Sequence, residues 1–161
     1  MKPVFQKVFT HGNGDCLRAV IASLLEVKLE DVPHFTEYNN WTMVMNRTLE
    51  EFGYTDEDTF YNPRFFWSSR FTTKPRVDDE GEFPKLKEMS GINGYHCALV
   101  ASPRFYEEGP KRPALHCVVI DNNYNIIHDP YYPKGTVYPL TDEVGYNGVL
   151  EVYVINLNKN N

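Results

Sequence analysis

The sequence has few of the features that mark secreted or membrane-spanning proteins. Its three cysteines are widely spaced, which argues against a disulfide framework. No stretch approaches the roughly 18 apolar residues of a membrane span, and the first residues do not run into the apolar core of a secretory signal. We therefore expect a cytoplasmic protein with free thiols and no membrane partner.

Basic residues are also scarce. The chain has 16 Lys and Arg against 22 Asp and Glu, a formal net charge of −6. A general nucleic-acid binder needs a basic face, so we expect no nucleic-acid partner.

Metal-binding spacings are missing as well, since neither Cys-x-x-Cys nor His-Glu-x-x-His occurs. We expect no metal and no cofactor. A set assembled from the cysteines and three histidines remains as an alternative, namely His96, His116 and His128.

The sequence does contain two clear helical patterns in its first third, and its 161 residues fit a single domain. A helix is predicted from near Asp15, and its region ends at Val32-Pro33 because a proline disfavours helix at the preceding residue. A second predicted helix covers about 38–52, with Gly53 as its C′ residue. After the second helix the sequence pattern for regular secondary structure weakens, and we predict a lid or an insertion at 56–93. The apolar stripe of the first helix consists of Leu17, Val20, Ile21, Leu24 and Leu25.

The last third is rich in β-branched and aromatic residues. The segment Leu115 to Ile120 is apolar at successive positions, as in a central strand that is covered on both faces. Helices followed by an antiparallel sheet make an α+β pattern. The predicted strands are Tyr95 to Ala101, Pro113 to Asp121, Tyr124 to His128 and Val149 to Ile155.

Cys16 is the strongest candidate for chemistry. It follows the flexible run Gly12-Asn13-Gly14, at the start of the first helix, where Asn13 or Asp15 would be the N-cap. A helix N-terminus lowers the pKa of a thiol, and the thiolate is the nucleophile of cysteine hydrolases. The alternative is that Cys16 is a small buried apolar residue. Cys97 and Cys117 are expected to pack in the sheet.

A predicted hairpin supplies the base and the group that orients it. If Asn122-Asn123 forms a two-residue turn, His116 lies directly opposite Asp129, close enough for a carboxylate to orient an imidazole. A three-residue loop would instead put Pro130 opposite His116, and a four-residue loop Tyr131.

Two other histidines compete for the role of base. His96 lies on a predicted strand and is a rival. His128 precedes Asp129, but in the predicted hairpin it points to the face opposite His116.

These segments match a known pattern. They resemble small papain-like cysteine-peptidase-fold proteins of bacteriophages and bacteria, and more distantly bacteriocin-processing peptidases and transglutaminase-like proteins. The resemblance covers the N-terminal third and much of the C-terminal half. The matching stretches are Gly14-Asp15-Cys16-Leu17-Arg18-Ala19, Ile21-Ala22-Ser23-Leu24-Leu25, Glu30-Asp31-Val32-Pro33-His34-Phe35, Ser102-Pro103-Arg104, His116-Cys117-Val118-Val119 and His128-Asp129-Pro130.

The resemblance implies a papain-like α+β fold and a thiol-protease mechanism. It assigns Cys16 as nucleophile, His116 as base and Asp129 as the orienting acid. The implied reaction is hydrolysis of a peptide, isopeptide or other amide bond in a peptide or protein substrate. If the chain is phage-encoded, the compartment is the host cytoplasm.

One position departs from the family pattern. Papain-like peptidases usually carry an oxyanion-binding Gln six residues before the nucleophile, where this chain has Thr10. Gln6 and Asn13 are the candidate replacements, together with the Cys16 N–H. Loss of such a donor lowers rates by about 10²–10³.

That departure leaves a second function open. The chain would then be a catalytically weak or inactive papain-fold protein that binds a host component. An aromatic run between Phe60 and Phe71 would be either its recognition surface or part of the core.

Overall fold

The computed structural model describes residues 1–10, 13–54, 91–102, 114–123, 125–131, 138–139 and 149–153. In these residues the helices come first and an antiparallel sheet follows, so the α+β prediction is confirmed. The predicted lid or insertion lies outside the described residues, apart from 91–93, and so does the whole aromatic run at 60–71.

The first predicted helix is α1, Cys16–Leu25. Its apolar stripe is buried apart from Leu25, which is partly buried, because α1 packs on the sheet. The helix ends earlier than predicted. Glu26 adopts a left-handed conformation with φ of 61°, and its N–H caps the carbonyls of Ala22 and Ser23. A short 3-10 helix, η1 (Leu29–Asp31), follows.

The second predicted helix is α2, Trp41–Glu51, which begins later than predicted because a 3-10 helix, η2 (Phe35–Glu37), precedes it. Gly53 has a φ of 88° and its N–H bonds to the Glu50 carbonyl, while the Tyr54 N–H bonds to Leu49. This is the Schellman arrangement that a C′ glycine permits. The helical end was therefore predicted correctly.

Within the described residues, the sheet has five strands in the order β4-β3-β2-β1-β5. Strand β2 lies in the middle, as its apolar sequence predicted, and residues 116–120 are buried. The two-residue strand β4 was not predicted. The strands are β1 (Tyr95–Ser102), β2 (Ala114–Asp121), β3 (Asn125–His128), β4 (Tyr138–Pro139) and β5 (Val149–Tyr153).

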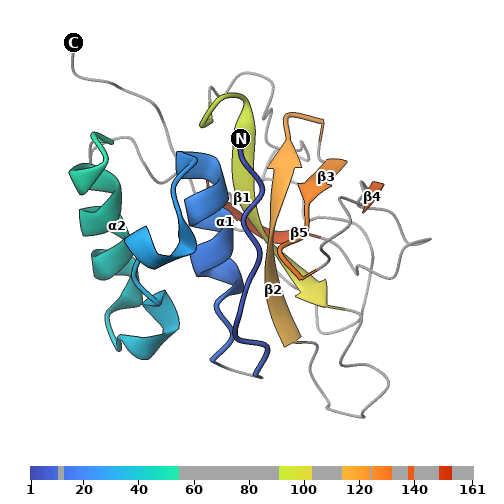
Figure 1. Cartoon of the computed structure of the whole chain (residues 1–161). Coiled ribbons are helices and arrows are strands. Elements are labelled where there is room, and N and C mark those ends of the chain that lie inside the picture. Colours follow the sequence, from blue (N-terminus) through green and yellow to red (C-terminus); the bar gives the residue numbers. More distant parts are fainter. Residues whose placement is uncertain are drawn as a thin grey trace, which may run out of the picture.

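The elements form layers, with α1 between α2 and the sheet (Figure 1). A single buried cluster joins both helices to β1 and β2 through residues such as Ile21, Met45, Leu49 and Val119. The first residues of the chain run beside α1 and across the sheet (Figure 1). None of the helices in the described parts is long and apolar enough to cross a membrane.

The predicted hairpin register is wrong. Ile120 pairs with Ile126, and a bulge then shifts the ladder so that Val119 pairs with His128. The turn is longer than Asn122-Asn123 because the Asp121 carboxylate accepts the N–H groups of Asn123 and Asn125. Pairing between β2 and β3 therefore ends before it reaches His116, which pairs with Val100 of β1 and does not lie opposite Asp129 in the β2–β3 ladder.

Candidate active site

Cys16 is the first residue of α1, as predicted, and Asp15 is the N-cap residue. The Asp15 side chain does not cap the helix. Its buried carboxylate instead accepts the N–H groups of Lys7 and Val8 at 2.9–3.2 Å, and the Asp15 N–H donates to the Val8 carbonyl. Asp15 thereby fixes the chain at residues 7–8 against the residue that precedes Cys16.

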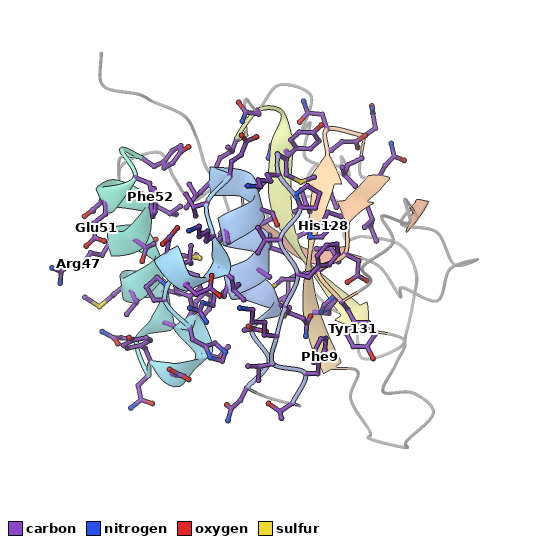
Figure 2. All side chains as sticks on the ribbon, in the orientation of Figure 1. Phe9, Arg47, Glu51, Phe52, His128 and Tyr131 are labelled. Carbon is purple, nitrogen blue, oxygen red and sulfur yellow. The ribbon has the colours of Figure 1, made fainter. Side chains whose placement is uncertain are left out.

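The same N-terminal segment lies along residues 128–131. The His128 ring contacts the Val4 carbonyl at 2.8 Å, and the Gln6 N–H donates to the Pro130 carbonyl. Phe9 packs edge-on against Tyr131 with ring centroids 5.3 Å apart, and Figure 2 shows this pair at one end of the sheet. One stretch of chain thus connects the start of α1 with the loop that carries Asp129.

His116 and Asp129 form a buried pair despite the changed register. The His116 Nε2 lies 2.7 Å from the Asp129 Oδ1, and the two side chains are 3% and 1% exposed. The Tyr131 N–H donates to the same Asp129 oxygen at 2.9 Å. Asp129 follows the end of β3 directly, so a turn and not the strand ladder positions its carboxylate.

This pairing determines the state of the imidazole. Burial alone lowers the pKa of His116, but the hydrogen bond to Asp129 and the interaction with Cys16 together raise it above its usual value. Because the Nε2–H donates to Asp129, the other ring nitrogen, Nδ1, is the one left to exchange a proton. His116 therefore presents Nδ1 as its acid–base atom.

His116 and Cys117 both influence the pKa of the Cys16 thiol. A hydrogen-bond interaction with Cys117 raises the pKa of Cys16 most, burial raises it next, and charge repulsion from Cys117 raises it further. Hydrogen bonding and charge from His116 lower the same pKa. The net direction is upward, so Cys16 is protonated at rest, and proton transfer toward His116 has to generate the thiolate.

The two candidate oxyanion donors differ in their surroundings. The Gln6 side chain is buried, and its Nε2 donates to the Val8 carbonyl at 3.0 Å. Its Oε1 is buried with no hydrogen-bond partner in the described part of the chain. Asn13 is exposed, in the turn before α1. The Gln6 amide is therefore the better fixed of the two.

The rival histidines are engaged elsewhere. His96 pairs with Ile120 at the other end of the β1–β2 ladder, about 13 Å along the strand from His116 at 3.3 Å per residue. Its Nε2 lies 2.6 Å from the Asn122 Oδ1. His128, labelled in Figure 2, bonds through its Nε2 to the Val4 carbonyl of the N-terminal segment.

The metal alternative has no geometric support where the chain is described. In those ranges, no group of three or more His, Cys, Asp and Glu side chains is arranged to hold a metal ion. The three histidines of that alternative lie in the three separate settings given above, bonded to Asp129, Asn122 and the Val4 carbonyl.

Two residues of the site were not recognised from the sequence. Asp15 was considered only as a helix cap, although its place in the Gly-Asp-Cys motif was a signal. Cys117 was expected simply to pack in the sheet. Adjacent residues of a strand point to opposite faces, so the alternation pattern did not predict that Cys117 and His116 both influence the pKa of Cys16.

Comparisons with known proteins found no match for this chain: no family model matches it, and neither a curated protein nor a solved structure matches it. The geometry of Cys16, His116 and Asp129 is therefore the basis on which the function is argued.

Proposed function

We propose that this protein is a papain-like cysteine hydrolase that cleaves a peptide, isopeptide or other amide bond. The observation that supports this most is the meeting of three groups at the start of α1: the Cys16 thiol, the His116 imidazole and the buried Asp129 carboxylate. A nucleophile, a base and a group that orients the base are the components that covalent acyl transfer needs.

The proposed reaction has two halves, acylation of Cys16 and hydrolysis of the acyl-enzyme, and each group acts once in each of them. The Cys16 proton moves to His116 Nδ1 while the sulfur attacks the carbonyl carbon of the substrate. The imidazolium, stabilised by Asp129, then gives that proton to the leaving amine and an acyl-enzyme remains. Water, deprotonated by His116, attacks the thioester, and the proton returns to the Cys16 sulfur as the acid product leaves.

The oxyanion would be bound at the N-terminus of α1. The Cys16 N–H belongs to the first turn of the helix, where N–H groups have no partner within the helix. The Gln6 amide is the proposed second donor. Its bond to the Val8 carbonyl uses one N–H and leaves the second for substrate.

A binding protein on the same fold is the second candidate. Two observations favour it: the raised pKa of the Cys16 thiol and the existing bond of the Gln6 amide to Val8. Both are features of a site that is not prepared for fast acylation. In this case the partner is a host protein and Cys16 has no chemical role.

Peptide cleavage tests the two candidates against each other. The purified protein is incubated with a diverse mixture of linear and isopeptide-linked peptides, and products are identified by mass spectrometry. We expect cleavage that disappears in Cys16→Ala, falls by about 10²–10⁴ in His116→Ala, and persists in the matched control Cys97→Ala. Cleavage that survives Cys16→Ala would refute the cysteine mechanism. A Cys16→Ala protein that keeps its full biological effect would support binding.

A further inference from the structure

An exposed aromatic side chain lies beside the proposed site. Phe9 is 56% exposed, and its ring meets the half-buried Tyr131 ring edge-on, at an interplanar angle of 84°. Among the residues that the structure describes, neither ring belongs to the buried cluster that joins the helices to the sheet. The two rings lie at the end of the sheet where the N-terminal segment turns into α1 (Figures 1 and 2). We call Phe9 and Tyr131 the aromatic pair.

Phe9 is tied to the residue that precedes the proposed nucleophile. Its neighbour Val8 donates its N–H to the Asp15 carboxylate at 2.9 Å, and the Val8 carbonyl accepts the Asp15 N–H at 3.3 Å. On the other side of Phe9, the Thr10 carbonyl lies so close to Gly14 that an added Cβ would be 3.3 Å from it. The backbone on both sides of Phe9 is therefore held against the turn that leads into α1.

Tyr131 is tied to the acid that orients the base. Its N–H donates at 2.9 Å to Asp129 Oδ1, the oxygen that lies 2.7 Å from His116 Nε2. The Pro130 carbonyl, directly before Tyr131, accepts the Gln6 N–H at 3.1 Å. The aromatic pair thus joins the two arms of the site, which are the segment before α1 and the turn after β3.

The aromatic pair has the chemistry to recognise another aromatic ring. Aromatic rings favour edge-to-face and offset contacts, and the exposed part of the Phe9 ring is available for one. Because the backbone around Phe9 is already fixed by hydrogen bonds, less conformational freedom is lost when that ring is covered. A peptide that presents an amide bond to Cys16 between the two arms brings its neighbouring side chains alongside the pair.

The charges near the aromatic pair do not favour a charged side chain in this place. The Lys and Asp side chains within two residues of the pair in the sequence already have ionic partners. Lys7 pairs with Glu30, and Asp129 pairs with His116. An uncharged aromatic group is therefore the better complement.

Exposed apolar side chains elsewhere provide an internal comparison. Tyr38, Met43 and Phe52 are also exposed, and they lie on α2 or directly beside it. Helix α2 lies on the side of α1 that faces away from the sheet, and Figure 2 labels Phe52 there, far from Phe9. Exposure alone therefore does not distinguish the aromatic pair, whereas its bonds to both arms of the site do.

We propose that the aromatic pair selects the substrate, and that this substrate is a peptide with an aromatic side chain close to the scissile amide bond. This inference rests on the proposed function, because it names the substrate class of the same site. Phe9 and Tyr131 determine specificity in this account and take no part in the chemical steps.

The sequences around the cleaved bonds are the first test. The full-length protein is incubated with the diverse peptide mixture, and the residues around each cleaved bond are identified by mass spectrometry. We expect Phe, Tyr or Trp within two residues of the cleaved bond about 10-fold more often than in the mixture, since burial of one aromatic side chain provides at least that factor. The enrichment should fall toward one in Phe9→Ala, persist in Phe9→Trp, and persist in the matched control Phe52→Ala.

Binding without hydrolysis separates this inference from the proposed function. The Cys16→Ala protein is immobilised, the same mixture is passed over it, and the retained peptides are identified. We expect an enrichment of aromatic peptides of about 10-fold, which is lost when Phe9→Ala is added and kept when Phe52→Ala is added. If the wild type cleaves no peptide but this enrichment is found, the hydrolase proposal fails and recognition of aromatic peptides by the pair stands.

Two results would overturn the inference. One is cleavage and binding without any preference for aromatic side chains, which leaves the hydrolase proposal standing. The other is a preference that survives Phe9→Ala or is lost equally in Phe52→Ala. Thermal unfolding shows whether each variant is folded. If Phe9→Ala is not, Tyr131→Leu decides in its place, because it removes the other ring and keeps the backbone N–H that Asp129 accepts.

Discussion

Two buried histidines lie toward opposite ends of the β1–β2 ladder, and their hydrogen-bond partners differ in charge. His116 Nε2 is 2.7 Å from a carboxylate oxygen of Asp129, and His96 Nε2 is 2.6 Å from an amide oxygen of Asn122. The geometry is nearly the same, but one partner carries a charge. The pKa of His116 is raised, whereas burial lowers the pKa of His96 despite its bond to Asn122.

The difference shows that burial of an imidazole does not by itself make an acid–base group. His96 is held neutral, and the turn around it is tightly packed: a Cβ added at Gly91 would lie 2.6 Å from its Cε1. His116 has an anionic partner on one side and a thiol on the other. We therefore assign a structural role to the His96 end and a chemical role to the His116 end.

Removal of the anionic partner should have the largest effect on stability. Asp129→Ala leaves a buried His116 without its charge partner, and breaking such a pair costs about 3–5 kcal/mol. The matched change Asn122→Ala removes one neutral hydrogen bond, which costs about 1 kcal/mol. Denaturant unfolding of both variants measures the difference in the free energy of unfolding. Equal losses of unfolding free energy in the two variants would contradict the distinction between the His116 and His96 ends of the ladder.

The stability lost in Asp129→Ala depends on pH, and the direction of the His116 pKa shift determines how. The folded pKa of His116 is raised, so the stabilisation is fully present below the unfolded value of about 6.5. It is lost as the pH rises through the folded pKa. The penalty of Asp129→Ala should therefore be greatest in mildly acidic solution and shrink toward alkaline pH.

The smallest expected effect comes from exchanging the hydrogen-bond partners of the two histidines, the Asp129 carboxylate and the Asn122 amide. NMR titration of the histidine ring protons should show His116 titrating above about 6.5 and His96 below it. Asp129→Asn should lower the pKa of His116, because a neutral amide replaces the carboxylate. Asn122→Asp should raise the pKa of His96 for the converse reason. Midpoints that do not respond to these exchanges would show that the partner's charge is not the cause.

The positions of the main elements were predictable because local chemistry determines them. An apolar stripe of period 3.6 located α1 with Cys16 at its start. A segment that is apolar on both faces identified β2 as the central strand. The contact of His116 with Asp129 was also predicted, but for the wrong reason. The expected two-residue turn is longer, because the Asp121 carboxylate binds backbone N–H groups on the far side of the turn.

The remaining features depend on packing between distant segments. A bulge between Val119 and Ile120 shifts the register, and no local sequence signal marks it. The influence of Cys117 on the pKa of Cys16 requires α1 to lie on the sheet at one particular position, which periodicity does not specify. The same holds for the bonds from Asp15 to Lys7 and Val8, which hold the N-terminal segment beside the site.

The most direct test of the central claim is the labelling rate of each cysteine. The fully reduced protein is treated with iodoacetamide, and modification of Cys16, Cys97 and Cys117 is followed by mass spectrometry. We expect Cys16 to react fastest, its rate to fall by about 10² in His116→Ala, and that rate to be unchanged in the matched control His96→Ala. Equal labelling of the three thiols, or a Cys16 rate that does not depend on His116, would contradict it.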